Sequence, residues 1–239
     1  MTQVMGIVNV TPDSFSDGGR YFRPEEAVRR ARNVIREGAD ILDLGAESTR
    51  PGAVPVAWED EWGRLEPVFA GLWAGTPPSI PVSVDTYHPE TARRAIGAGA
   101  RIINCVYPEP VPEMLEMLRE FPQTELVMPA SCRELAAGDL AGRVYLDPMI
   151  GFGTTREEDL ELLRGLPELA RTARVLVGAS RKRIVKRLTG EKVTGKNLGG
   201  NLGIAVWCAM NGAAVVRVHD VVETVQALKV IDALTLSRG

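Results

Sequence analysis

The sequence predicts an α/β protein, a single (β/α)8 TIM barrel domain that spans residues 1–239. Short apolar, β-branched runs recur eight times, and each is followed by a loop and then by a longer segment with helical spacing. Runs that are almost wholly apolar suit parallel strands that are covered on both faces. Eight such units in a chain of this length favour closure into one barrel over the alternative, an open doubly wound sheet.

The eight expected strands share this apolar, β-branched composition, and they are residues 4–10, 41–45, 81–86, 101–106, 125–130, 144–148, 175–180 and 215–220. The clearest helix begins at Pro24, followed by two acids, and ends at Gly38. Similar helices are expected over 89–96 and 220–231. Only residues 131–142 separate the fifth and sixth strands, which leaves room for at most a short helix around 134–137. The connection is therefore shortened, and the outer ring is expected to be thin there.

Composition narrows the class of partner. The 28 Lys and Arg against 31 Asp and Glu give a net charge of -3, which provides no basis for holding a nucleic acid or an anionic membrane, so small molecules are favoured. The cysteines Cys105, Cys132 and Cys208 show no metal-site spacing and fit a reduced compartment. No apolar run approaches the roughly 18 residues of a membrane span, and a soluble, cytoplasmic protein is expected.

Polar residues end the apolar runs, where a parallel barrel collects its catalytic groups. The carboxylates and amide of Asp85, Asn104 and Asp147 suit the donor-rich edge of a planar heterocycle. The cations and proton donors suit phosphate oxygens, and they are Arg50, Lys182, Arg217 and His219. Each residue alone has a structural alternative, such as Asp85 capping the helix near Pro89. Together they predict a site for a heterocycle that carries a diphosphate.

Several motifs carry a family resemblance. Residues 5–19 (MGIVNVTPDSFSDGG) look like the opening signature of dihydropteroate synthases, and residues 47–53 (ESTRPGA) resemble their second signature loop. Further matches follow in order, at residues 83–86, 103–104, 147–153, 178–182 and 217–220. The resemblance runs through nearly the whole chain, and it is far more specific than a lone glycine motif.

The resemblance implies an enzyme of folate biosynthesis, a transferase that joins 6-hydroxymethyl-7,8-dihydropterin diphosphate to p-aminobenzoate and releases pyrophosphate with the help of Mg2+. By similarity the pterin would be held by Asp85, Asn104, Asp147 and Lys182. The diphosphate would be held by Asn9, Arg50, Arg217 and His219, with Asn9 also at the metal. The p-aminobenzoate would lie near Phe15, Thr49, Pro51, Phe152 and Ser180. Catalytic roles would fall to Lys182, Asp85, Arg217 and His219.

The chain departs from the family pattern in one sector. Cys105 follows Asn104 where Asp is usual, Pro129 and Ala130 replace a His-Met pair, Met149 replaces Gly, and Thr154 replaces Lys. Cys105 is expected to be a small core residue without a catalytic role. Met149 adds a side chain beside Asp147 and is expected to narrow the floor of the pterin pocket. The thin outer ring would expose apolar surface, from which we hypothesise a homodimer.

Two other functions stay open at this stage. One is a methyltransferase domain, because barrels that present methyltetrahydrofolate to a corrinoid protein also bind a pterin through Asp and Asn residues. A diphosphate gives Arg50, Arg217 and His219 an evident role, whereas a methyl donor gives them a less evident one. A non-catalytic pterin-binding homologue is the third possibility, because the altered sector could mark a loss of turnover. His88 precedes Pro89 at a predicted helix start, and it is expected at the surface.

Overall fold

The computed structural model describes residues 1–11, 23–48, 54–136, 138–193 and 195–236. Eight parallel strands form a closed barrel in sequence order, with β1 paired to both β2 and β8. The strands are β1 (Gln3–Asn9), β2 (Ile41–Gly45), β3 (Val82–Asp85), β4 (Ile102–Asn104), β5 (Glu125–Pro129), β6 (Val144–Asp147), β7 (Arg174–Val177) and β8 (Val215–Val218). The expected fold class and all eight expected strands are confirmed.

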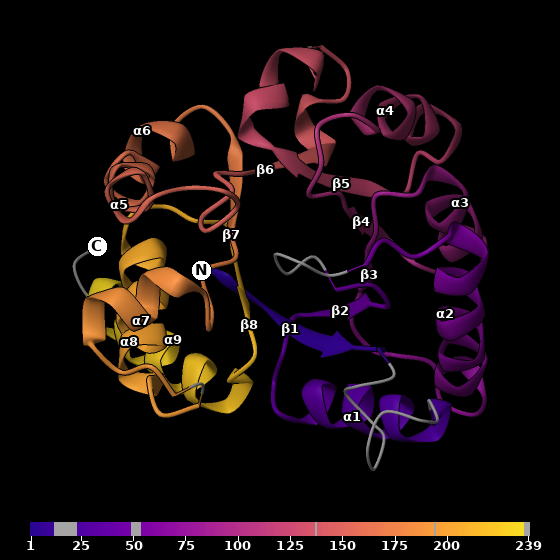
Figure 1. Cartoon of the computed structure of the whole chain (residues 1–239), viewed down its shortest axis with the longest axis horizontal. Helices are drawn as coiled ribbons and strands as arrows, with labels where there is room; N and C mark the ends of the chain where they lie inside the picture. The colour runs from indigo at the N-terminus through magenta and orange to yellow at the C-terminus, as the bar shows by residue number, and fades with distance from the viewer. Residues whose placement is uncertain (12–22, 49–53, 137, 194, 237–239) are drawn as a thin grey trace.

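Helices form a ring outside the barrel, as Figure 1 shows. They are α1 (Pro24–Arg36), α2 (Trp58–Trp73), α3 (Pro89–Gly97), α4 (Val111–Glu120), α5 (Arg156–Arg164), α6 (Leu166–Ala170), α7 (Arg183–Thr189), α8 (Leu198–Met210) and α9 (Val221–Leu236). Local sequence explains their starts: α1 has Pro24 in its first turn, and α5 has a capping box between Thr155 and Glu158. None of the described helices is long and apolar enough to cross a membrane.

The connection between β5 and β6 is thin, as expected. It contains two short 3-10 helices, η2 (Ala130–Ala136) and η3 (Ala141–Arg143), and no α-helix among its described residues. The guanidinium of Arg143 closes the gap by donating hydrogen bonds to the carbonyls of Leu118, Phe121 and Thr124. These bonds tie the short connection to the end of α4, so backbone polar groups there are satisfied without a full covering helix.

The barrel interior is built in layers. Seven strands contribute one side chain each to an apolar layer, which consists of Met5, Ile41, Ile102, Val127, Tyr145, Leu176 and Val215. Successive side chains of a strand point to opposite faces, so a residue two positions later shares the interior face. Two positions after these apolar residues come Asp43, Asn104, Asp147 and Arg217. The period of the strands therefore places a polar layer directly above an apolar one, toward the carboxyl ends of the strands.

Candidate active site

An arginine and two carboxylates form the centre of the polar layer. Arg217 on β8 donates from Nε to Asp43 Oδ2 at 2.7 Å and from Nη2 to Asp85 Oδ2 at 2.6 Å. The Asp43 side chain is fully buried, and the Arg217 side chain is 17% exposed. One guanidinium on β8 thus reaches past β1 to contact both β2 and β3, and it fixes the orientation of both carboxylates.

Three buried acceptor atoms in this layer have no hydrogen-bond partner among the described residues. They are Asp43 Oδ1, Asp85 Oδ1 and Asn104 Oδ1. Asp85 and Asn104 are register partners on adjacent strands, so their side chains lie next to each other. Buried acceptors without partners are costly in a folded protein. Their presence together indicates a ligand edge that supplies N–H donors.

The charges of this centre depend on burial and on one another. Burial raises the pKa of Asp85 to about 7, while the guanidinium of Arg217 opposes the shift and the charge of Asp43 adds to it. Burial alone would lower the pKa of Arg217, but Asp43 and Asp85 outweigh it and raise that pKa. Arg217 therefore stays protonated, and Asp85 exchanges its proton near neutral pH.

Asp147 and Lys182 form the neighbouring part of the layer. Asp147 Oδ1 accepts the backbone N–H of Met149 at 2.7 Å, and Lys182 Nζ donates to the carbonyl of Ile150 at 2.6 Å. The ammonium also lies 4.1 Å from the centroid of the Phe152 ring. The segment after β6 thus holds both the carboxylate and the ammonium, and it brings Phe152 to the same mouth.

Burial also shifts these two groups. It lowers the pKa of Lys182 to about 8, against the opposing effect of Asp147, and it raises the pKa of Asp147. Each group is easier to neutralise than in water, and each limits the shift of the other. Lys182 is therefore a proton donor whose charge changes just above neutral pH.

Met149 has a left-handed backbone, with φ of 63°. That conformation costs about 1–2 kcal/mol for a residue with a β-carbon, and glycine adopts it freely. The usual Gly at this position thus has a backbone explanation. The strained turn points the Met149 N–H at Asp147. The expected narrowing of the pocket floor by the Met149 side chain stays a prediction.

Ser180 and His219 meet at the ends of β7 and β8. The Ser180 hydroxyl lies 3.1 Å from His219 Nδ1, and its oxygen accepts the His219 backbone N–H at 3.3 Å. An oxygen that accepts from the backbone has its own hydrogen available for the ring nitrogen. The two contacts fix the plane of the imidazole, so the predicted p-aminobenzoate and diphosphate residues touch at this point.

Two glycines lie against residues of the polar layer. A β-carbon on Gly151 would come within 3.0 Å of Lys182 Cδ, and Gly151 has φ of 77°. A β-carbon on Gly178 would lie 3.8 Å from Arg217 and 3.9 Å from Asp147 Oδ2. A side chain at Gly151 would therefore crowd Lys182, whereas one at Gly178 would make ordinary contacts with Arg217 and Asp147.

The structure thus brings together most of the predicted site. It gathers Asp85, Asn104, Asp147, Lys182, Arg217, His219, Phe152 and Ser180 at the carboxyl end of the barrel, and Asn9 ends β1 at the same rim. Four predicted residues lie outside the described part of the chain: Phe15, Thr49, Arg50 and Pro51. Cys105 is buried in the core as expected, and its thiol donates to the carbonyl of Tyr107. Burial raises the pKa of this thiol to about 12, which keeps it protonated.

Asp43 was missed in the sequence analysis. It stands inside the apolar run of β2, and a charged residue in such a run was the available signal. His88 precedes α3 as its N-cap, as expected, and its side chain is partly buried, with Nε2 2.9 Å from the carbonyl of Val56 and 3.5 Å from Glu47. Glu47 in turn accepts the Tyr87 hydroxyl at 2.7 Å. This cluster anchors the backbone at Val56 beside the barrel rim.

The fold and the site define a class: a parallel barrel whose polar layer offers unpartnered acceptors to a planar, donor-rich heterocycle, beside cationic groups. A sequence profile described as pterin binding enzyme matches residues 5–137 and 129–219. The chain belongs to this family of pterin-binding enzymes.

Within that family the chain resembles dihydropteroate synthases. It is 38% identical to the dihydropteroate synthase of Neisseria meningitidis serogroup B over an alignment of 269 positions. The alignment covers 98% of this chain and 93% of the relative. The Escherichia coli K12 dihydropteroate synthase is also 38% identical, with 98% and 92% covered. These relatives are transferases.

Solved structures agree with the sequence relatives. The Xanthomonas albilineans dihydropteroate synthase with 4-aminobenzoic acid has a TM-score of 0.86 and 37% identity, with 98% of this chain and 93% of that one covered. The Clostridium difficile dihydropteroate synthase in the presence of pteroic acid has a TM-score of 0.88 and 33% identity, with 98% and 96% covered. Likeness at this level of identity supports a shared activity as well as a shared fold.

Proposed function

We propose that this chain is a dihydropteroate synthase that condenses 6-hydroxymethyl-7,8-dihydropterin diphosphate with p-aminobenzoate and releases pyrophosphate. One observation carries the proposal: three buried acceptors in the polar layer, on Asp43, Asp85 and Asn104, have no partners among the described residues. The exocyclic amine and ring N–H groups of a pterin would supply the missing donors. The named relatives favour this activity over a methyltransferase or a non-catalytic binder.

Cleavage of the C–O bond between the pterin methylene and the diphosphate develops two opposite charges, and different residues are assigned to each. Negative charge develops on the leaving diphosphate, and Arg50, Arg217, His219 and Asn9 are assigned to it. Positive charge develops on the pterin methylene, and the carboxylates of Asp85 and Asp147 stabilise it at short range. Lys182 hydrogen-bonds the pterin beside them. The arylamine then attacks the methylene carbon from the side of Phe152 and Ser180, with Phe15, Thr49 and Pro51 completing its site.

Mg2+ fits this site as part of the substrate. The described residues contain no group of three or more His, Cys, Asp or Glu that could hold a metal ion. Asn9 offers one amide oxygen at the end of β1, and Mg2+ is often held mainly by phosphate oxygens and water. The ion would therefore arrive with the diphosphate, where it neutralises charge on the leaving group.

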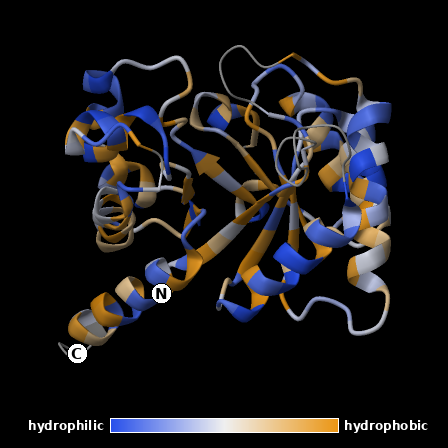
Figure 2. Ribbon diagram, turned by 60° about the horizontal axis from the view of Figure 1, so that its bottom comes forward, coloured by the Kyte–Doolittle hydropathy of each residue, from blue (hydrophilic) through white to orange (hydrophobic). Residues whose placement is uncertain are grey.

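A homodimer is proposed through α8 and α9, which pack against each other. Large apolar side chains are exposed there, at Trp207, Met210, Val230 and Leu234. In the thin sector, where the sequence suggested a dimer contact, Leu135 is the exposed large apolar residue among those described. Figure 2 shows the C-terminal end of α9 extending from the barrel with apolar residues on it. Light scattering of the protein and of a Met210→Glu variant, over a range of concentrations, tests this; a monomer throughout contradicts it.

Pyrophosphate release tests the activity. It should require both the pterin diphosphate and p-aminobenzoate, should depend on Mg2+, and should be lost in Asn104→Leu, which removes one acceptor without adding charge. A protein that binds the pterin diphosphate but releases no pyrophosphate with p-aminobenzoate would be a binder and not a synthase. A cytoplasmic location, proposed from composition, is checked by fractionating cells of the source organism.

A further inference from the structure

Arg181 lies between two site residues, Ser180 and Lys182, and its backbone has an unfavourable left-handed conformation. Its φ is 60°, and Met149 is the other non-glycine residue with positive φ in the described part of the chain. A β-carbon makes this left-handed conformation unfavourable. Such a conformation persists where the surroundings hold it, and Ser180 and Lys182 flank it directly.

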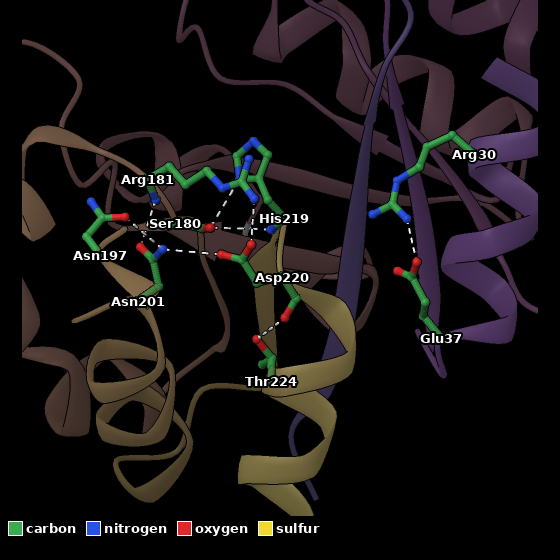
Figure 3. A network of polar contacts seen from close by, with 9 residues as sticks. All are labelled: Arg30, Glu37, Ser180, Arg181, Asn197, Asn201, His219, Asp220 and Thr224. Atoms are coloured by element: carbon green, nitrogen blue, oxygen red, sulfur yellow. Dashed lines mark hydrogen bonds and ion pairs between the residues drawn. The ribbon is translucent and has the colours of Figure 1, made fainter. Parts of the chain in front are cut away.

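Asn201 on α8 provides that hold. Its side-chain oxygen accepts the Arg181 backbone N–H at 2.9 Å, and its amide nitrogen donates to Asp220 Oδ2 at 3.3 Å. Asp220 Oδ1 accepts from Arg181 Nη2 at 2.5 Å. Figure 3 shows the three residues closing a ring of contacts between the β7–α7 turn, α8 and the end of β8. Asn201 is only 8% exposed, so water does not readily replace these bonds.

The ring lies just outside the pocket and sets the direction of the chain that enters it. The Lys182 backbone N–H donates to the carbonyl of Ala179 at 3.2 Å, which closes the turn around Arg181. On one side of that turn Ser180 contacts the His219 ring, and on the other Lys182 reaches Ile150. A change in φ at Arg181 would rotate Ser180 and Lys182 relative to each other.

We propose that Asn201 is a positioning residue for the reaction: it holds Arg181 in the left-handed conformation and thereby aligns Lys182 and Ser180 in the pterin pocket. Asn201 touches neither substrate in this account, and it acts through the turn. The inference rests on the proposed synthase function for its kinetic test, and on Lys182 itself for a second test that needs no turnover.

The first test compares Asn201→Ala with Asn211→Ala, the matched control. Asn211 ends the same helix, and its amide donates to the carbonyl of Trp207 at 2.8 Å, far from the turn at Arg181. Displacement of a positioned group by about 1 Å can cost on the order of a hundredfold in rate, so Asn201→Ala should lower kcat/KM for the pterin diphosphate by roughly ten- to a hundredfold. Asn211→Ala should leave it near the wild-type value. Equal values for the two variants would overturn the proposal.

The second test is a rescue. Glycine adopts positive φ without strain, so Arg181→Gly removes the need for a clamp. The double variant Asn201→Ala, Arg181→Gly should recover much of the activity that Asn201→Ala loses. A merely structural role for Asn201 predicts no recovery, and absence of recovery in the double variant would contradict the mechanism.

The third readout follows Lys182 directly. The chain has only five lysines, so NMR of 13C-methylated lysines resolves its titration, and Lys182→Arg identifies the signal. The charges that face Lys182 are Asp147, Arg217, Asp85 and Asp159. Its pKa should rise from about 8 toward the ordinary value in Asn201→Ala and return in the double variant. An unchanged titration in Asn201→Ala would overturn the positioning role, whereas absence of pyrophosphate release in the wild type would overturn only the proposed function.

Discussion

Replacing Arg217 by Met tests the assignment of the central ion pairs. The substitution removes the guanidinium that bridges Asp43 and Asp85 and keeps a long apolar stem in its place. Asp43 is fully buried and the Asp85 side chain is 13% exposed, so water cannot solvate the two carboxylates that remain. Removing one partner of a buried ion pair costs about 3–5 kcal/mol, because an uncompensated charge is left behind.

The matched control is Arg93→Met. Arg93 on α3 also makes two contacts to a carboxylate, donating to Glu120 at 2.5 and 3.0 Å, but the side chains are 35% and 52% exposed. Surface pairs of this kind contribute about 0–1 kcal/mol. In a protein of this size each 1 kcal/mol shifts the Tm by about 2–4 °C. Arg217→Met should therefore lower the Tm by about 6–20 °C at pH 8, and Arg93→Met by about 4 °C or less.

The loss should depend on pH. Without Arg217 the pKa of the buried Asp85 lies still further above the ordinary 3.8 of Asp, so the folded state binds more protons than the unfolded state in the window between. Stability then rises as the pH falls, since protonation removes the uncompensated charge. At pH 5 the difference between Arg217→Met and the wild type should be smaller than at pH 8.

Thermal unfolding at the two pH values measures both effects, and binding of the pterin alcohol and of its diphosphate completes the assay. Because Arg217 orients Asp85, both ligands should bind more weakly, with the larger loss for the diphosphate. A Tm at pH 8 no lower than that of Arg93→Met, or a loss that grows on acidification, would refute the buried-pair account. Normal affinity for the alcohol would show that Asp85 does not depend on Arg217.

Three further predictions concern the same pocket. The kcat/KM for the pterin diphosphate should be highest between about pH 7 and 8, because binding needs ionised Asp85, with pKa about 7, and protonated Lys182, with pKa about 8. Asp85→Asn should abolish the fall in kcat/KM below about pH 7, and a kcat/KM of the wild type that does not change with pH would contradict these two roles. Met149→Gly should leave the stability within about 1 kcal/mol of the wild type, since relief of the left-handed strain offsets the greater entropy that glycine gives the unfolded chain. Met149→Val should be the least stable of the three proteins in thermal unfolding, and the reverse order would count against backbone strain at this position. Gly151→Ala should weaken pterin binding by displacing Lys182, whereas Gly138→Ala, with the same sign of φ and open space around it, should lower only the stability. Titration calorimetry measures the pterin affinity of both variants, and equal affinities would be evidence against crowding of Lys182 by a side chain at position 151.

The strand-end residues were predictable because strands have a fixed period and a fixed direction. Asn104 and Asp147 lie near the ends of apolar runs and are the last residues of β4 and β6, and a parallel barrel brings such ends to one rim whatever the details of packing. Asp43 was harder to place because it lies inside a run and not at its end. Its meaning depends on Arg217, which is 174 positions away in sequence and is its partner only in the closed barrel.

Backbone conformation was the other feature hidden from the sequence. Met149 was expected to act through its side chain, and the structure adds a left-handed turn whose N–H supports Asp147. Arg181 gave no signal, because arginine does not indicate positive φ, and the residue that stabilises it, Asn201, comes from another helix. The sequence gives the type of each side chain, but it does not give the φ angle that contacts with other segments impose on a residue.

The sequence alone determined the barrel, the order of its strands, the thin connection between β5 and β6, and the pterin-binding character of its rim. These features follow from local periodicity and from motifs that are contiguous in the chain. The tertiary structure decided which charges are paired, which acceptors lack partners, and which residues hold Lys182 in place. Those properties depend on burial and on distances between segments far apart in the chain, and burial sets both the pKa values and the cost of an uncompensated charge.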